Sequence, residues 1–236
     1  MTTGLNVVGV LAERYSKKPA IRSLLHLIPG WGAADTLLQY RADEIRKDRA
    51  RTFFDELSEG KHEITDELIE KEDFLHSYFA TLRAILNTRQ REKIRLFARL
   101  LNSSLAPTFG PTTDEYEEFL SVLEATTLRE FAVLRDLRTY ELKHVRTAEE
   151  NELQNAWKFW DQFKSSSVRT YGIPDEAFPA FMAKLEWTGL YLRITGGYMD
   201  YGGDIGRTTP LFARLLELVS DSRAQQAHAS DALPRA

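Results

Sequence analysis

The sequence contains no cysteine among its 236 residues. Disulfide bonds, thiolate nucleophiles and zinc sites built on cysteine are therefore excluded. Long apolar runs are also missing, because the most apolar stretch, residues 20–38, is interrupted by Arg22, His26, Asp35 and a Pro-Gly pair. A helix that crosses a bilayer needs about 20 apolar residues in succession. Residues 5–18 lack a basic leader and a small-residue cleavage site, so the sequence predicts a cytoplasmic protein.

An excess of positive charge is missing as well. The formal net charge is −4 and the isoelectric point is about 5.8, which argues against a protein that coats nucleic acid. The apolar and charged contents, 43% and 28%, are those of an ordinary globular protein with a proper core.

Helical patterns fill most of the chain. Apolar residues recur at helical spacing, and two capping boxes, Thr127 with Glu130 and Thr147 with Glu150, mark helix starts. A turn or kink is expected at residues 87–90, and a loop at 165–174. The expected helices cover approximately 4–15, 20–28, 35–57, 65 or 73 to 86, 92–105, 114–125, 127–142, 147–165, 175–187 and 209–219.

The best domain boundary is the stretch APTFGPTTD at 106–114, with two prolines and a glycine. It divides the chain into an N-terminal helical bundle (1–106), a linker (107–113) and a second domain (114–222). Residues 223–236 have little to bury and are predicted to be a disordered tail.

The second domain is predicted to be winged-helix-like, because helices are followed by a strand, a glycine-rich turn, a second strand and a last helix. The strand at 190–195 alternates apolar residues, and residues 198–201 are expected to pair with it across Gly196 and Gly197. Gly202, Gly203 and Gly206 would then lie at the wing exit. No lysine follows these glycines as a phosphate-binding loop requires, so we interpret them as turn residues.

The helix at 175–187 would occupy the recognition position of such a domain. It carries three acidic residues and one lysine. DNA-binding recognition helices present arginine, lysine, asparagine or glutamine to the DNA. The residues of this helix therefore argue against DNA binding by the second domain.

Two patches stand out as candidate interaction sites. The first is apolar and comprises Leu27, Ile28, Trp31 and Leu37; we expect core packing, and the alternative is insertion into a partner or a lipid surface. The second is basic and comprises Arg89, Arg91, Lys93 and Arg95. It is a candidate for binding an anion, RNA or an acidic partner. The simpler interpretation is that its charges face the acidic stretch 62–76 in a helical hairpin.

No catalytic, cofactor or metal site is predicted. The stretch 62–76 is rich in acids and holds two histidines, but it lacks the His-Glu-x-x-His spacing of zinc proteases, so we expect a solvated acidic face. An aromatic cluster at Trp157, Phe159, Trp160 and Phe163 is expected in the core, and any exposed remainder would be a partner surface.

Three segments, residues 88–105 (TRQREKIRLFARLLNSSL), 127–134 (TLREFAVL) and 209–219 (TPLFARLLELV), together resemble the abortive-infection alpha family. The first, with residues 16–38, also resembles uncharacterised bacterial helical proteins. The resemblance implies a bacterial protein of phage defence and supplies no catalytic residues.

Together these observations predict a non-enzymatic accessory or effector protein of bacterial antiviral defence. It would act through contacts with a protein partner or with itself, as a homo-oligomer. One alternative is a membrane-active effector that uses residues 5–38 and associates with the membrane on activation. Another is a DNA-binding regulator, which the charges argue against. No small-molecule substrate is predicted.

Overall fold

The computed structural model describes residues 13–27, 37–107, 109–195 and 205–220. In this part the chain is mostly helical with a small two-stranded antiparallel sheet, which confirms the predicted fold class at this level. The chain divides into two compact units, one with residues up to 121 and from 218 on, the other with residues 122–217. The predicted tail and most of the predicted first helix lie outside the described residues.

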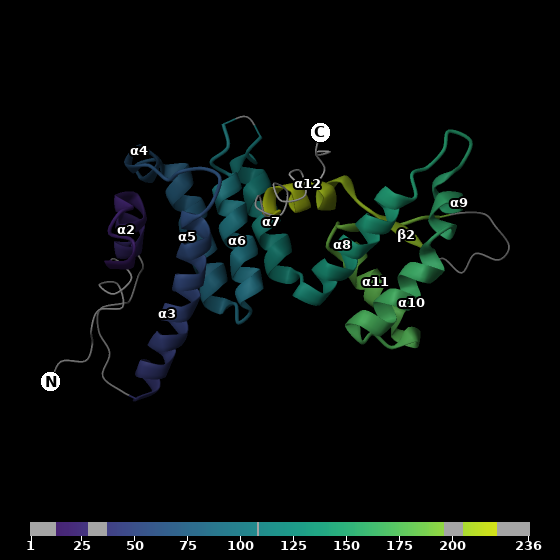
Figure 1. Cartoon of the computed structure of the whole chain (residues 1–236), viewed down its shortest axis with the longest axis horizontal. Coiled ribbons are helices and arrows are strands. Elements are labelled where there is room, and N and C mark those ends of the chain that lie inside the picture. The colour runs from purple at the N-terminus through teal and green to yellow at the C-terminus, as the bar shows by residue number, and fades with distance from the viewer. Residues whose placement is uncertain (1–12, 28–36, 108, 196–204, 221–236) are drawn as a thin grey trace, which may run out of the picture. The chain divides into compact units, whose positions relative to one another are not determined.

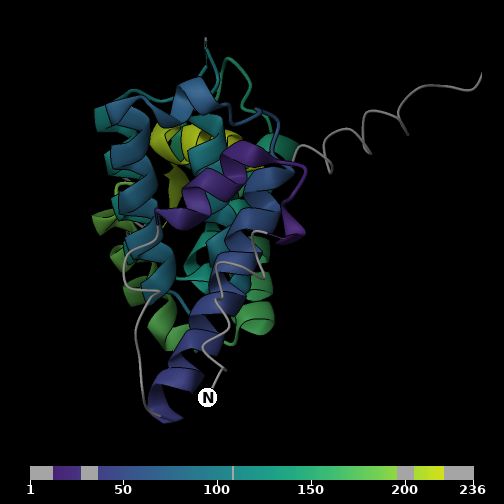
Figure 2. The same cartoon turned by 90° about the vertical axis from the view of Figure 1, so that its left-hand side faces the viewer.

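The first unit is a bundle in which α3 packs against α5 and α6, and these two pack against each other (Figure 1). Figure 2 looks onto α2, drawn in purple, which packs against α4. The Tyr78 hydroxyl of α5 donates to the Leu24 carbonyl of α2 at 2.7 Å. The helices are α2 (Pro19–His26), α3 (Leu37–Ser58), α4 (Asp66–Ile69), α5 (Glu72–Asn87), α6 (Arg91–Ser103) and most of α7 (Thr113–Ala125).

A buried amide fixes the chain after α3. Asn102 of α6 is 5% exposed. Its Oδ1 accepts from the His62 backbone N–H at 3.1 Å, and its Nδ2 donates to the His62 carbonyl at 2.7 Å. The Asn102 side chain thereby forms hydrogen bonds with both the N–H and the carbonyl of His62, as expected for a buried amide, which needs hydrogen-bond partners.

The division between the units falls inside α7, after residue 121, and not in the predicted linker at 107–113. The reason is burial in the first half of the helix. Tyr116 and Phe119 are 1% and 0% exposed, and the Tyr116 hydroxyl is hydrogen-bonded to Thr81 of α5. Burial raises the pKa of the Tyr116 phenol above its usual value.

The second unit surrounds an aromatic core with helices and places the sheet beside them. Trp160, Phe163 and Phe178 pack in pairs with ring centroids 5.3 to 6.4 Å apart. Strand β1 packs against α11, and β2 against α8 and α9. The elements are α8 (Leu128–Lys143), α9 (Glu152–Trp157), α10 (Trp160–Tyr171), the 3₁₀ turn η1 (Asp175–Ala177), α11 (Phe178–Trp187), β1 (Tyr191–Arg193), β2 (Gly206–Thr208) and α12 (Pro210–Val219), whose last two residues belong to the first unit.

Two predicted helix starts are confirmed and a third is wrong. Thr127 and Glu130 form a capping box on α8, and the Thr209 hydroxyl accepts from the Phe212 N–H at the start of α12. Thr147 does not start a helix. Asn151 and Gln154 form the capping box that begins α9.

The predicted loop at 165–174 is also wrong over most of its length. Helix α10 continues to Tyr171 because its small Ser167 is buried on the same side as Trp160 and Phe163. Gly172 then ends it with φ of 61°, a left-handed conformation that glycine adopts without strain. Tertiary burial therefore overrides the weak helix preference of the serines.

The partner of the predicted strand differs from the expected one. Strand β1 pairs with residues 206–208, in the register Tyr191 to Thr208, Leu192 to Arg207 and Arg193 to Gly206. Residues 198–201 and most of the predicted turn glycines lie outside the described residues. Gly206 lies within β2, where a Cβ atom would overlap the Tyr191 ring, so close packing is the reason for glycine at this position.

Candidate functional site

The predicted basic patch lies at the start of α6, and two of its four charged residues meet acids of α3. Arg91 forms two hydrogen bonds to Asp48, at 2.7 and 3.1 Å. Arg95 pairs with Glu92, and its Nε lies 3.8 Å from Glu56. The interpretation that the patch faces the acidic stretch 62–76 is therefore wrong for these two arginines, because α3 packs along α6 and supplies Asp48 and Glu56.

The other two residues of the patch have different surroundings. The Lys93 ammonium lies 6.0 Å from the ring centroid of Phe97. Arg89 is exposed and lines a cavity of about 580 Å³ that also holds Glu44, Asp48 and Arg49. The mixed charges of this cavity do not favour one kind of ligand.

The predicted apolar patch is only partly described. Leu27 follows α2 and is 39% exposed. Ile28 and Trp31 lie outside the described residues, as does the side chain of Leu37.

Among the described residues, no group of three or more histidine, aspartate or glutamate side chains could hold a metal ion. Within the predicted acidic face, His76 lies 3.4 Å from Glu117 of α7, and His62 is held through its backbone by Asn102. No described helix is long and apolar enough to cross a membrane.

The most exposed large apolar side chain in the described part of the chain is Trp187, at the end of α11, with 92% of its surface in solvent. Helix α11 buries Phe178, Met182 and Leu185 against its own unit. Trp187 lies off this stripe, two residues after Leu185, so the helix turns it outward. Ala180 and Pro179 are exposed on the same helix.

The charged side chains of α11 form ion pairs with neighbouring elements, and Arg129 of α8 lies 5.5 Å from the ring centroid of Phe181. Lys184 donates to Glu130 of α8 at 2.5 Å, and Glu186 lies 3.6 Å from Arg193 of β1. Asp175 and Glu176 of η1 are exposed before the helix begins. A surface with these charges repels a polyanion and presents an apolar anchor to other partners.

Strand β1 adds a second exposed apolar residue close in sequence to this helix. Leu192 is 44% exposed, whereas Tyr191 is buried, because successive side chains of a strand point to opposite faces. We call Trp187, Ala180 and Pro179 the α11 face. The sequence analysis placed the helix at 175–187 in the recognition position and did not single out Trp187, although its position off the line of Phe178, Met182 and Leu185 is visible in the sequence.

The predicted aromatic cluster is mostly core. Phe159, Trp160 and Phe163 are 0 to 3% exposed, as expected, whereas Trp157 is 41% exposed at the end of α9. Leu142, in the last turn of α8, is 63% exposed.

None of the known protein-family models matches this chain, and neither the curated proteins nor the solved structures gave a match. The resemblance to the abortive-infection alpha family therefore stays a prediction from the sequence.

Proposed function

We propose that this chain is a non-enzymatic accessory or effector protein of bacterial antiviral defence, which binds a protein partner through the α11 face. The observation that carries the proposal is the 92% exposure of Trp187. Burying about 200 Å² of tryptophan surface contributes roughly 5 kcal/mol before the costs of association. Tryptophan is accordingly one of the residues that most often dominate protein interfaces.

We further propose that the second unit is a winged-helix-like domain that works as a protein-binding module in the cytoplasm. The order of its helices and two strands supports this assignment, with α11 in the recognition position and β1–β2 as the wing. Its exposed acids and paired Lys184 favour a protein over DNA. A fold alone does not assign function, so the charges and Trp187 carry the argument.

The test is a phage challenge of a bacterial strain that expresses the chain, with plating efficiency as the readout. Trp187→Glu should abolish protection while the melting temperature of the purified variant stays unchanged. Val145→Glu is the matched control, since Val145 is 74% exposed in the same unit but lies after α8. Protection that persists in Trp187→Glu contradicts the role of the α11 face.

A second measurement separates the kinds of partner. Light scattering of the pure chain and pull-down of the tagged chain from infected cells should show a stoichiometric protein partner or a defined oligomer, lost in Trp187→Glu. Robust nuclease, NADase or hydrolase activity of the pure chain would overturn the non-enzymatic proposal.

A further inference from the structure

The N-terminal end of α3 extends past the two helices that it packs against. Asp48 of α3 pairs with Arg91, the first residue of α6, and Arg49 donates to the Leu86 carbonyl near the end of α5. Helix α3 begins 11 positions before Asp48, at Leu37. At about 1.5 Å per residue, roughly 16 Å of helix lies beyond these contacts, and Figure 1 shows this end of α3 projecting past α5 and α6. Helices gain most of their stability from packing, so a surface that packs beside this end stabilises it.

A cavity of about 580 Å³ lies beside α3 where this projection begins. Ile45 of α3 and Ile94 of α6 form its apolar part. Ile94 is fully buried, whereas 52% of Ile45 is exposed. Apolar surface that is covered on association contributes roughly 25 cal/mol per Å² before the costs of association. Ile45 is therefore the apolar centre that a partner at this cavity would cover.

Five charged residues line the same cavity, and two of them have no partner. Asp48 and Arg91 pair with each other, and Arg49 donates to a backbone carbonyl. Within the described part of the chain, Glu44 and Arg89 form no hydrogen bond or ion pair, and both are exposed. Glu44 belongs to α3, and Arg89 to the turn before α6. The cavity thus carries one unpaired acid and one unpaired base.

We infer that a second copy of the chain covers this cavity in a symmetric dimer. In a dimer with a two-fold axis both copies use the same patch, so each contact between two different residues occurs twice. Glu44 of each copy then faces Arg89 of the other, and the two Ile45 side chains meet close to the axis. A patch that carries one unpaired charge of each sign is complementary to itself in this arrangement.

The same charges disfavour other occupants of the cavity. A polyanion would meet Glu44, and a basic peptide would meet Arg89. One isoleucine from each copy and two exposed ion pairs stabilise a complex only modestly, so we expect a dimer that dissociates on dilution. This inference does not depend on the proposed interaction through the α11 face.

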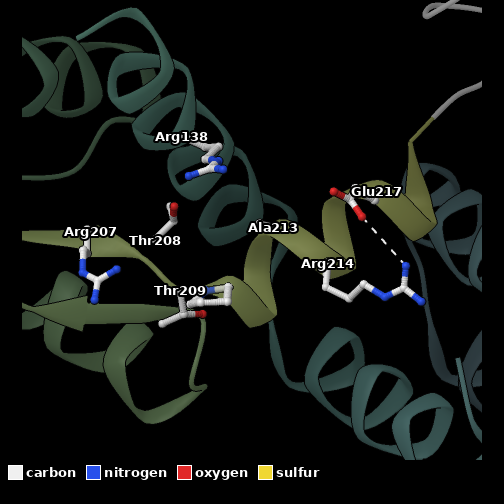
Figure 3. Close-up of a pocket in the computed structure, with 8 residues that line it drawn as sticks. Arg138, Arg207, Thr208, Thr209, Ala213, Arg214 and Glu217 are labelled. Atoms are coloured by element: carbon white, nitrogen blue, oxygen red, sulfur yellow. Dashed lines mark ion pairs between the residues drawn. The ribbon is translucent and has the colours of Figure 1, made fainter. Parts of the chain in front are cut away.

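The pocket of about 320 Å³ in the second unit does not have this property. Arg138, Arg207 and Arg214 line it, and the side chains of Arg207 and Arg214 point away from each other (Figure 3). Each charged residue of this lining has a partner in its own unit. The ion pairs are Arg138–Glu141, Arg207–Glu152 and Arg214–Glu217. No unpaired acid and base are left there for a second copy to engage.

Sedimentation equilibrium of the full chain over a range of concentrations tests the dimer. The wild type should pass from monomer to dimer as the concentration rises. Ile45→Glu should weaken dimerisation at least about tenfold, because it places two carboxylates at the centre of the contact. Its melting temperature should equal that of the wild type in dilute solution, since Ile45 is half exposed. Trp187→Glu is the matched control, because it changes an exposed apolar residue of the other unit in the same way, and it should dimerise like the wild type.

Charge reversal tests the symmetry of the contact. Glu44→Arg and Arg89→Glu should each weaken self-association about tenfold, since both contacts across the axis become repulsive. An equimolar mixture of the two variants should form a dimer with nearly the affinity of the wild type, because each contact then joins opposite charges. Arg83→Glu is the matched control, since Arg83 is an exposed residue of α5 outside the cavity lining.

Three results would overturn the proposal. The first is a wild-type chain that stays monomeric up to about 1 mM. The second is a dimer that Trp187→Glu dissociates and Ile45→Glu leaves intact, because the α11 face would then be the contact between copies. The third is a mixture of Glu44→Arg and Arg89→Glu that stays monomeric while the wild type dimerises, because these two residues would then not face each other across a two-fold axis.

Discussion

Glu130 combines two roles in one buried side chain. It is 3% exposed, closes the capping box of α8 by accepting from the Thr127 backbone N–H at 2.7 Å, and accepts from Lys184 of α11 at 2.5 Å. Burial raises the pKa of its carboxyl, but the hydrogen bonds from Lys184 and Thr127 outweigh burial and lower the pKa below its usual value. The charged form is therefore the one that the fold stabilises.

We expect Glu130→Ala to lower the free energy of unfolding by about 1–3 kcal/mol, because it removes the cap and the partner of Lys184. Glu130→Gln keeps the cap and should cost less. Since the folded pKa lies below the unfolded one, the difference in the free energy of unfolding between wild type and Glu130→Gln should be full above the unfolded pKa and shrink as pH falls through the folded pKa. Urea unfolding of the wild type and the two variants at several pH values measures the loss of stability and its pH dependence. A stability difference between wild type and Glu130→Gln that grows toward acid pH contradicts this account.

At the residue scale, the capping box of Glu130 was predictable because its signal is local. Thr127 and Glu130 are three residues apart, and the structure forms the expected pair. Its bond to Lys184 was not predictable, because the two residues are 54 positions apart and meet only through the packing of α8 and α11.

At the element scale, the small sheet depends on one glycine. Gly206 lies opposite Arg193 in the register, and a Cβ on it would overlap the Cζ and hydroxyl oxygen of Tyr191, which is 2% exposed. The sequence analysis interpreted Gly206 as a turn residue at the exit of the wing, whereas the structure places it inside β2, where close packing against Tyr191 requires glycine. The sequence analysis expected residues 198–201 to pair with the first strand, whereas residues 206–208 do so. Strand pairing depends on side-chain packing and not on alternation alone.

We expect Gly206→Ala to lower the free energy of unfolding by about 1–3 kcal/mol through overpacking. The penalty should fall in a Tyr191→Leu background, since the atoms that the new methyl group meets are then absent. A double-mutant cycle by chemical denaturation measures this. Equal penalties in the two backgrounds would show that the Tyr191 ring is not the cause.

At the scale of the whole molecule, each unit has its own buried core. The first is built around residues such as Phe53, Phe97 and Tyr78, and the second around Phe163 and Phe178. Proteins with separate cores commonly unfold in more than one step.

We therefore expect two transitions in scanning calorimetry. Asn102→Ala, which leaves the His62 backbone groups without partners, should lower only the transition of the first unit. Glu130→Ala should lower only that of the second. A single transition that both substitutions shift would mean that the units unfold together.

The sequence by itself determined the helical class, the helix breaks at 87–90, the caps at Thr127 and Thr209, and a strand near the end, because these features depend on neighbours within a few residues. Only the tertiary structure decided which acids face Arg91 and Arg95, that Trp187 is exposed, and that Arg138, Arg207 and Arg214 share a pocket. Arg138 and Arg207 lie 69 residues apart along the chain, and Arg207 and Arg214 lie 7 residues apart. Their meeting depends on how α8, β2 and α12 pack, which periodicity in one segment does not encode.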